Sequence, residues 1–262
     1  LGINSTLDIG PNTLSTQNDA VINPSNSSGA LGFSQGNLII SSTSASAHHI
    51  NLVPGRDSLN HVHVEVPAGT DINLNTMTYL TGSLKVQSGQ VQSGGNLVLV
   101  SDENIDANIE KIEDEGSVEG DVVYQRYWSR PVGSYGFFYL GVPVLGQTIG
   151  DWMDDFHIQG VDGSFPNAWK NLMIYDEVNE QWTSMSSSQD VVAPGVGVNA
   201  FMFASNFEDA YIKYENVGPI TQGAFEFNLT QTSGNSDPGW NLVANPYPST
   251  IDWSRVRWSE AP

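Results

Sequence analysis

Three side chains that can bind metals alternate along one segment of the chain. His61, His63 and Glu65 occupy every second position, so on a β-strand all three point to the same face. Two imidazoles at i and i+2 can share a metal ion, with the carboxylate as a third ligand, and His48 and His49 are further candidate ligands. The alternative is an exposed polar face whose intervening valines pack in the core. Nothing in the neighbouring sequence supplies the outer hydrogen bonds that orient metal-bound histidines.

Acidic residues form two other candidate ion sites. Asp151, Asp154 and Asp155 lie beside two aromatic residues, and residues 101–121 hold nine carboxylates and one lysine. Carboxylates with flexible spacing can bind Ca²⁺, but the regular spacing of an EF-hand loop is missing. A solvated acidic face is the alternative. We expect no cofactor, and calcium is the one metal ion that these clusters leave open.

The seven tryptophans indicate a different chemistry, which is stacking against sugar rings. Trp has a flat apolar body and a polar N–H group, so it suits such contacts when it is exposed. Three tryptophans lie in or beside apolar segments and are expected in the core: Trp128, Trp240 and Trp253. Three lie near predicted loops and are the candidate glycan-binding residues: Trp152, Trp169 and Trp182. Packing in the core or at its rim is the alternative for these three as well.

The sequence contains no convincing catalytic constellation. Residues 32–36 match the G-x-S-x-G pattern, but that nucleophile elbow needs a strand before the serine and a helix after it. Here a turn precedes the serine and a strand follows it. The chain has no Cys, which excludes disulfides and cysteine nucleophiles. With 29 acidic residues, some pair always looks suitable for glycoside hydrolysis, so that pattern is uninformative. We therefore expect a protein that is not an enzyme.

Charge and composition exclude several classes of partner. The chain has 9 Lys and Arg against 29 Asp and Glu, a formal net charge of −20. Such a surface repels phosphate backbones and anionic lipids, so we expect no nucleic-acid or membrane-surface partner. Charged residues make up only 15% of the chain, below the usual fraction of about 25%. Ser, Thr, Asn and Gly supply the remaining polarity, as is typical of extracellular β-proteins. No apolar run approaches 18 residues, so no transmembrane segment is expected.

Aromatic residues divide the chain into two parts. Residues 1–120 contain only Phe33 and Tyr79, whereas the other 24 aromatic residues follow them. A phrase of glycine, polar residue and leucine begins at Gly36, Gly82 and Gly95. Short strands with small aliphatic cores favour a β-solenoid over residues 1–100, where each coil packs on its neighbours. An open sandwich is the alternative.

The remainder is expected to be a junction followed by an antiparallel β-sandwich-like domain over residues 121–262. In the junction, residues 101–120, Ile105, Ile109 and Ile112 have helical spacing and acids surround them. This pattern predicts a short amphipathic helix that caps the last solenoid rung, residues 97–100. The strands predicted after the junction are 121–128, 136–140, 172–175, 198–203, 211–214, 225–229 and 239–243.

An ordered series of phrases in residues 80–258 resembles a known class of proteins. The most specific phrase is Gly239-Trp-Asn-Leu-Val-Ala-Asn-Pro-Tyr-Pro-Ser-Thr-Ile-Asp-Trp253, with two prolines that force a stiff extended turn. Earlier phrases are Gly95-Asn-Leu-Val-Leu-Val, Gly120-Asp-Val-Val-Tyr-Gln-Arg-Tyr-Trp, Gly141-Val-Pro-Val, Gly146-Gln-Thr-Ile-Gly-Asp-Trp-Met-Asp-Asp-Phe156, Leu172-Met-Ile-Tyr-Asp-Glu177 and Pro194-Gly-Val-Gly-Val198. The series resembles the region before the sorting domain of Bacteroidetes surface proteins exported by type IX secretion. No sorting domain is visible, so we expect a piece of a longer polypeptide.

The resemblance implies an extracellular location at the outer cell surface, and secretion machinery or other surface proteins as partners. Asp57-Ser58-Leu59 resembles the short O-glycosylation pattern of Bacteroidetes, which predicts Ser58 as a modified residue on a surface loop. Together these features predict a non-enzymatic structural or adhesive module of a larger secreted protein. The alternative is a carbohydrate-binding or polysaccharide-processing accessory module, with glycans as partners.

Overall fold

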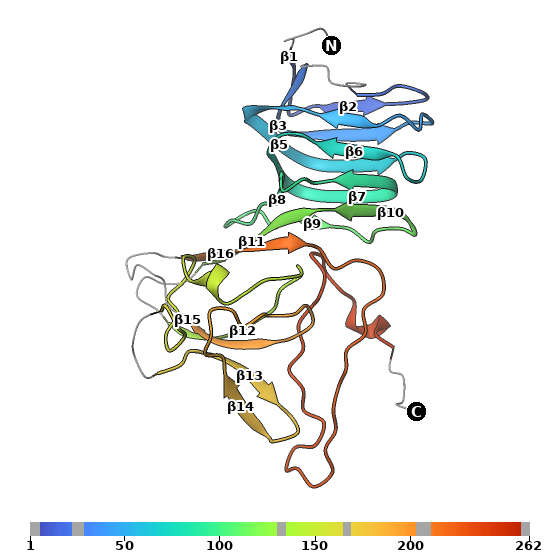
Figure 1. The fold of residues 1–262 in the computed structure, drawn as a ribbon. Helices are drawn as coiled ribbons and strands as arrows, with labels where there is room; N and C mark the ends of the chain where they lie inside the picture. The colour runs from blue at the N-terminus through green and yellow to red at the C-terminus, as the bar shows by residue number, and fades with distance from the viewer. Residues whose placement is uncertain (1–5, 23–28, 130–134, 165–168, 203–210, 258–262) are drawn as a thin grey trace.

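The computed structural model describes residues 6–22, 29–129, 135–164, 169–202 and 211–257. The chain is all-β and contains a β-solenoid followed by a separate four-stranded antiparallel sheet (Figure 1). The solenoid spans residues 6–124 in about five turns. Within the described residues, no helix is both long and apolar enough to cross a membrane.

Parallel strands stack along the solenoid, as the sequence predicts. The main path runs β1-β3-β5-β7-β8-β11, and β2, β4, β6, β9 and β10 join it from the other sides of the coils. The strand bounds are β1 Thr6–Gly10, β2 Thr13–Thr16, β3 Ala30–Ser41, β4 His48–Ile50, β5 Leu52–Glu65, β6 Asp71–Leu74, β7 Thr78–Gln92, β8 Leu97–Leu99, β9 Asn108–Ile109, β10 Glu115–Glu119 and β11 Asp121–Ser129.

Aliphatic side chains at matching positions of successive coils fill the solenoid. Leu38, Val62, Leu84 and Ile109 are register partners in turn. Two of the three glycine phrases belong to this column, because Leu38 and Leu84 end them. The third phrase lies elsewhere, since its Leu97 pairs with Thr78. The first two phrases are therefore two coils apart in one column and the third lies in another, which explains the irregular spacing in the sequence.

The glycines of these two phrases allow adjacent coils to approach closely. A Cβ on Gly36 would lie 2.6 Å from the carbonyl oxygens of Gly10 and Asn12, and one on Gly82 would lie 2.3 Å from that of Asn60. Both contacts are with backbone, so a side chain cannot be accommodated without separating the coils.

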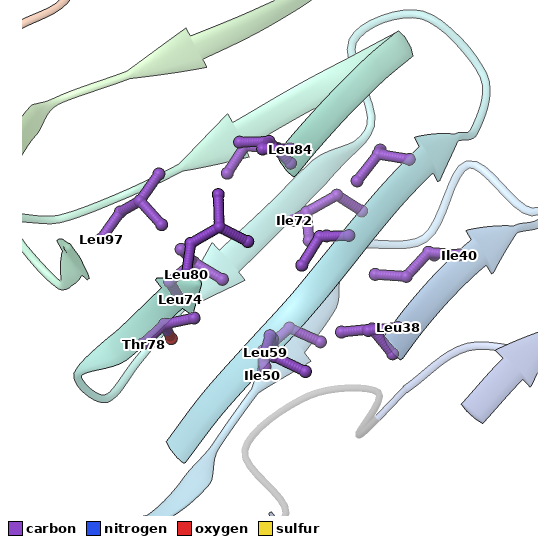
Figure 2. A pocket seen from close by; sticks show the side chains of 13 residues that line it. Leu38, Ile40, Ile50, Leu59, Ile72, Leu74, Thr78, Leu80, Leu84 and Leu97 are labelled. Atoms are coloured by element: carbon purple, nitrogen blue, oxygen red, sulfur yellow. The ribbon is translucent and has the colours of Figure 1, made fainter. Parts of the chain in front are cut away.

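The centre of the solenoid holds an apolar void of about 20 Å³. Figure 2 shows leucine and isoleucine side chains from β3, β5 and β7 pointing into it. Thr78 supplies the only hydroxyl in its lining. Because a buried water needs two or more polar partners, this void is a packing defect and no binding pocket.

Residues 101–120 correct one prediction. They form no helix and instead add the strands β9 and β10, both paired in parallel with β7. Ile109 is buried in the solenoid core, Ile112 packs against it, and the carboxylates are exposed as predicted. The isoleucine spacing therefore serves a further solenoid coil, and the solenoid continues beyond residue 100.

The C-terminal β-region, residues 135–257, has an antiparallel sheet of order β12-β15-β13-β14. Its strands are β12 Gly136–Leu140, β13 Leu172–Asp176, β14 Gln181–Ser184 and β15 Val198–Met202, and β16 Tyr211–Pro219 pairs antiparallel with β11. Two short 3-10 helices, η1 Gly150–Trp152 and η2 Trp253–Arg255, complete the assigned elements. The strands predicted at 225–229 and 239–243 are absent, because no neighbouring strand forms a ladder with them; only Val243 makes a single bridge, to Val196.

The C-terminal β-region itself caps the solenoid, in place of the predicted helix. Val144 and Ile220 form an antiparallel bridge and belong to the buried solenoid core. The Ile109 N–H donates to the Pro248 carbonyl (2.9 Å), and the Gln222 side chain bonds both backbone groups of Val118. The last coil is thus covered by residues from three segments of the following region.

Candidate binding surface

One face of the four-stranded sheet is buried and the other carries exposed aromatic rings. On β15, Val198, Ala200 and Met202 are fully buried, so the residues between them point outward. On β12, Phe138 stacks on Trp128 inside, whereas Phe137 and Tyr139 are more than half exposed. We call this outer surface the aromatic face; its rings are Tyr135, Phe137, Tyr139, Trp169, Tyr175, Trp182, Phe201 and Trp240.

The first ring cluster centres on Phe201. Phe137 is its register partner on β12, with ring centroids 5.0 Å apart. Tyr135 and Trp169 approach the same ring at 5.5 and 4.9 Å. Tyr135 is 69% exposed, so the cluster presents ring edges and faces to solvent.

The second cluster lies at the β13–β14 hairpin. Tyr175 and Trp182 are register partners with centroids 5.3 Å apart, and Trp240 packs against Tyr175 at 4.3 Å. The planes of Trp182 and Trp240 meet at 71°. These two tryptophans therefore do not form a coplanar platform; their rings are angled to each other and partly exposed.

A buried carboxylate holds Trp240 in this cluster. Glu177, in the hairpin turn, accepts hydrogen bonds from the Thr232 N–H (2.7 Å) and the Gly239 N–H (2.9 Å). These backbone donors lower the pKa of Glu177 to about 2. Asn235 also donates to the Glu177 carbonyl at 2.6 Å. The turn thus fixes residues 232–239, which lead directly into Trp240.

An amide lies in the middle of the aromatic face. Asn199 lies on β15 between Tyr139 on β12 and Met173 on β13. It is 9% exposed, and its Oδ1 atom has no hydrogen-bond partner among the described residues. A buried acceptor without a donor is costly to keep, so this atom is a feature that packing alone does not explain.

The tryptophans only partly follow the sequence prediction. Trp169 is about half exposed and Trp182 is partly exposed, as expected. Trp152 is wrong as a glycan-binding residue, because it is fully buried and its Nε1 donates to Asn216 Oδ1 at 2.9 Å. Trp240 and Trp253, expected in the core, are 41% and 53% exposed.

Most of the aromatic face is not predicted from the sequence. Phe137 and Tyr139 alternate with Phe138 and Leu140, so β12 is apolar on both sides and its outer side cannot be identified from the pattern. Aromatic residues on both faces of a strand were the available signal, since an ordinary half-buried strand places polar residues on one face.

His61, His63 and Glu65 lie on one face of β5, and the intervening valines pack against the core, which is the arrangement given above as the alternative to a metal site. His61 Nδ1 lies 3.0 Å from Ser83 Oγ, within a ladder of polar side chains. His63 faces Lys85 on the next coil, and this cation opposes the binding of another. No group of three potential ligands suited to a metal ion occurs in the described part of the chain.

Asp154 and Asp155 line an open hollow of about 510 Å³ together with Asp151 and Glu215. Asp155 Oδ2 accepts from the Glu215 N–H at 2.8 Å, and Asp151 Oδ2 accepts from the Thr148 N–H at 2.7 Å. Burial, followed by the negative charges of Asp154 and Glu215, raises the pKa of Asp155 to about 7. A calcium ion here remains a prediction. Asp151 and Asp155 already accept hydrogen bonds from backbone N–H groups.

Ser58 does not lie on a loop, which corrects that part of the prediction. It is within β5, half-buried, and its Oγ accepts from the Gln35 N–H at 3.0 Å. Its glycosylation stays a prediction. The G-x-S-x-G residues lie inside β3, so the structure supplies no nucleophile elbow there.

The chain matches no family model, no curated protein and no solved structure. The geometry of the solenoid and of the aromatic face therefore carries the functional argument.

Proposed function

We propose that the chain is a non-enzymatic structural and adhesive module of a larger secreted cell-surface protein, exported by a type IX-like system. The solenoid acts as a stiff spacer, and the C-terminal β-region presents the contact surface. The phrases that resemble type IX cargo support the location, and the Ser-, Thr- and Asn-rich strands suit an extracellular protein.

The observation that carries the adhesive role is the aromatic face. Soluble proteins rarely expose large apolar patches, and those that do usually use them for binding. Tyr135, Phe137 and Tyr139 are all more than half exposed on or beside one strand. Rings of Tyr and Trp offer large contact areas at a low entropic cost, which makes them suitable anchors.

The stiffness of the spacer follows from its hydrogen bonding. Each coil is fixed to the next by parallel ladders and by side chains that bridge coils. One such series runs from Asn37, whose Nδ2 donates to Thr13 Oγ1, through His61 to Ser83, which donates to Glu110 at 2.7 Å. Stacked repeats of this kind transmit contacts only to their neighbours and form extended rods.

The experiment is surface proteolysis of intact cells of the organism that produces the protein. An antibody to the C-terminal β-region is expected to bind intact cells, and external protease is expected to remove that signal while a cytoplasmic marker survives. Recovery of the protein only from the cytoplasmic fraction would contradict the proposal.

A carbohydrate-binding accessory is the second candidate function. The same aromatic face favours it, since flat rings suit sugar contacts. The angled rather than coplanar arrangement of Trp182 and Trp240 fits a single chain bent across the rings better than a flat crystalline surface.

A further inference from the structure

We propose that the aromatic face binds a neutral polysaccharide chain, with Asn199 as a hydrogen-bonding residue beneath it. This inference rests on the proposed adhesive function and names the chemistry of its partner. It depends on three properties of the face: the kind of side chains, the charge around them and the unpaired amide.

The kind of side chain favours sugars. The outward positions of the four strands hold Phe137 and Tyr139, Asn199 and Phe201, Met173 and Tyr175, and Trp182 and Ser184. None of them is Leu, Ile or Val. Aromatic rings carry partial negative charge on their faces, and this attracts the C–H groups on the faces of a pyranose ring, which are slightly positive.

The charge around the face favours a neutral ligand. Carboxylates flank the hairpin end: Asp176, Glu177, Glu180 and Asp237 lie near Tyr175. Burial, followed by these negative charges, raises the pKa of Tyr175. The whole chain carries a formal charge of −20. A polyanion, or a second copy of this chain, would be repelled, whereas an uncharged glycan would not.

The unpaired amide supplies the polar contact that a sugar needs. Asn199 Oδ1 is buried in the middle of the face without a donor in the described residues. A sugar hydroxyl is a donor of the right kind, and pairing with it would remove the cost of the orphaned acceptor. Four strands span about 14 Å across the sheet, so the face accommodates an oligosaccharide segment and not a single residue.

The experiment measures retention of the purified chain on insoluble cellulose, chitin, starch and xylan, with heparin–agarose as the polyanion. We expect at least one neutral polymer to retain the chain, and we expect heparin–agarose not to retain it. Trp182→Ala and Trp240→Ala are each expected to weaken retention about tenfold, which corresponds to about 1.4 kcal/mol. Trp253→Ala is the matched control, an exposed tryptophan outside the sheet, and is expected to leave retention unchanged.

Asn199→Leu separates binding from folding. We expect it to weaken retention at least fivefold while the melting temperature stays the same or rises, because it removes an unsatisfied acceptor. Retention by none of the four neutral polymers, equal losses for Trp253→Ala, or a self-association that Trp182→Ala abolishes would each overturn the inference. If intact cells display the protein but no polymer retains it, the glycan proposal fails and the surface function stands.

Discussion

The solenoid buries leucine, isoleucine and valine in repeating columns, whereas the C-terminal β-region buries Trp152 against Phe156 and Tyr214. In the solenoid every coil repeats the same contact, and the contacts are local. In the C-terminal β-region a few large side chains each contact several segments. Stability is therefore distributed along one part and concentrated in the other. Among the described residues, the second part is the one that exposes aromatic rings over a sheet.

The largest expected effect concerns this concentrated core. Trp152→Ala removes a fully buried ring together with the hydrogen bond to Asn216. It is expected to destabilise the C-terminal β-region by about 3–5 kcal/mol. Chemical unfolding followed by near-UV circular dichroism measures this loss, while limited proteolysis is expected to leave the solenoid intact.

Trp253→Ala is the control, because Trp253 is 53% exposed and its ring stacks on Phe227 at the surface. A two-phase unfolding in which the solenoid melts last supports the comparison. Simultaneous loss of both parts in the Trp152 variant would show that they form one cooperative unit.

The second prediction tests the cap that joins the two parts. Ile220→Asp places a carboxylate in the buried layer over the last coil and is expected to cost about 2–4 kcal/mol. It is also expected to promote association through the uncovered solenoid end, because unpaired rungs associate edge to edge. Sedimentation velocity measures the oligomeric state.

Leu145→Asp, an exposed position beside Val144, is the matched control and is expected to stay monomeric. If Ile220→Asp remains monomeric and as stable as the parent chain, the C-terminal β-region is merely attached to the solenoid and does not cap it.

A smaller effect is expected from the turn that holds Trp240. The folded pKa of Glu177 is about 2, below its ordinary value of 4.5. The carboxylate therefore contributes stability above pH 4.5, and that contribution is lost as the pH falls toward 2. Glu177→Gln is expected to remove this part of the pH dependence of stability. It is also expected to weaken the mutual fluorescence quenching of Trp182 and Trp240, which Trp emission measures.

A second pH-dependent effect concerns Asp155. Its folded pKa of about 7 exceeds the ordinary value of 3.8, so ionisation opposes folding. Stability is therefore expected to fall as the pH rises from 3.8 through 7. Asp155→Asn keeps an acceptor for the Glu215 N–H and is expected to be more stable than the parent above pH 7 and equal to it near pH 4. Thermal melts at both pH values measure the difference.

Glu226→Gln removes one exposed charge and is the control for both carboxylate variants. If it changes the pH profile as much as Asp155→Asn does, the effect reflects net charge and not the buried carboxylate.

The sequence predicted the all-β class and most strands, because alternation and β-branching act locally. It predicted a helix at 101–120, since isoleucines at spacings of four and three suit a helix as well as a strand followed by a turn. Only pairing with β7, which is distant in the sequence, decides between the two.

The candidate surface was harder to predict than the fold. Trp152 lies within a loop-like acidic segment, yet η1 folds it inward against Asn216 on β16. Trp240 precedes an apolar run, yet that run forms no strand and leaves the ring on the hairpin. Tertiary contacts decide which tryptophan is exposed, and these contacts cannot be inferred from the residues adjacent in the sequence.

The most direct test of adhesion through the aromatic face uses beads coated with the chain. Their adhesion to the extracellular matrix of the organism that produces the protein is measured. Two double variants are compared with the parent: Phe137→Ser with Tyr139→Ser on the aromatic face, and His61→Ala with His63→Ala on the solenoid. We predict that the first double variant loses most of the adhesion, at least about tenfold, and that the second retains it. Adhesion that depends on the solenoid histidines and survives the loss of the rings would contradict this prediction.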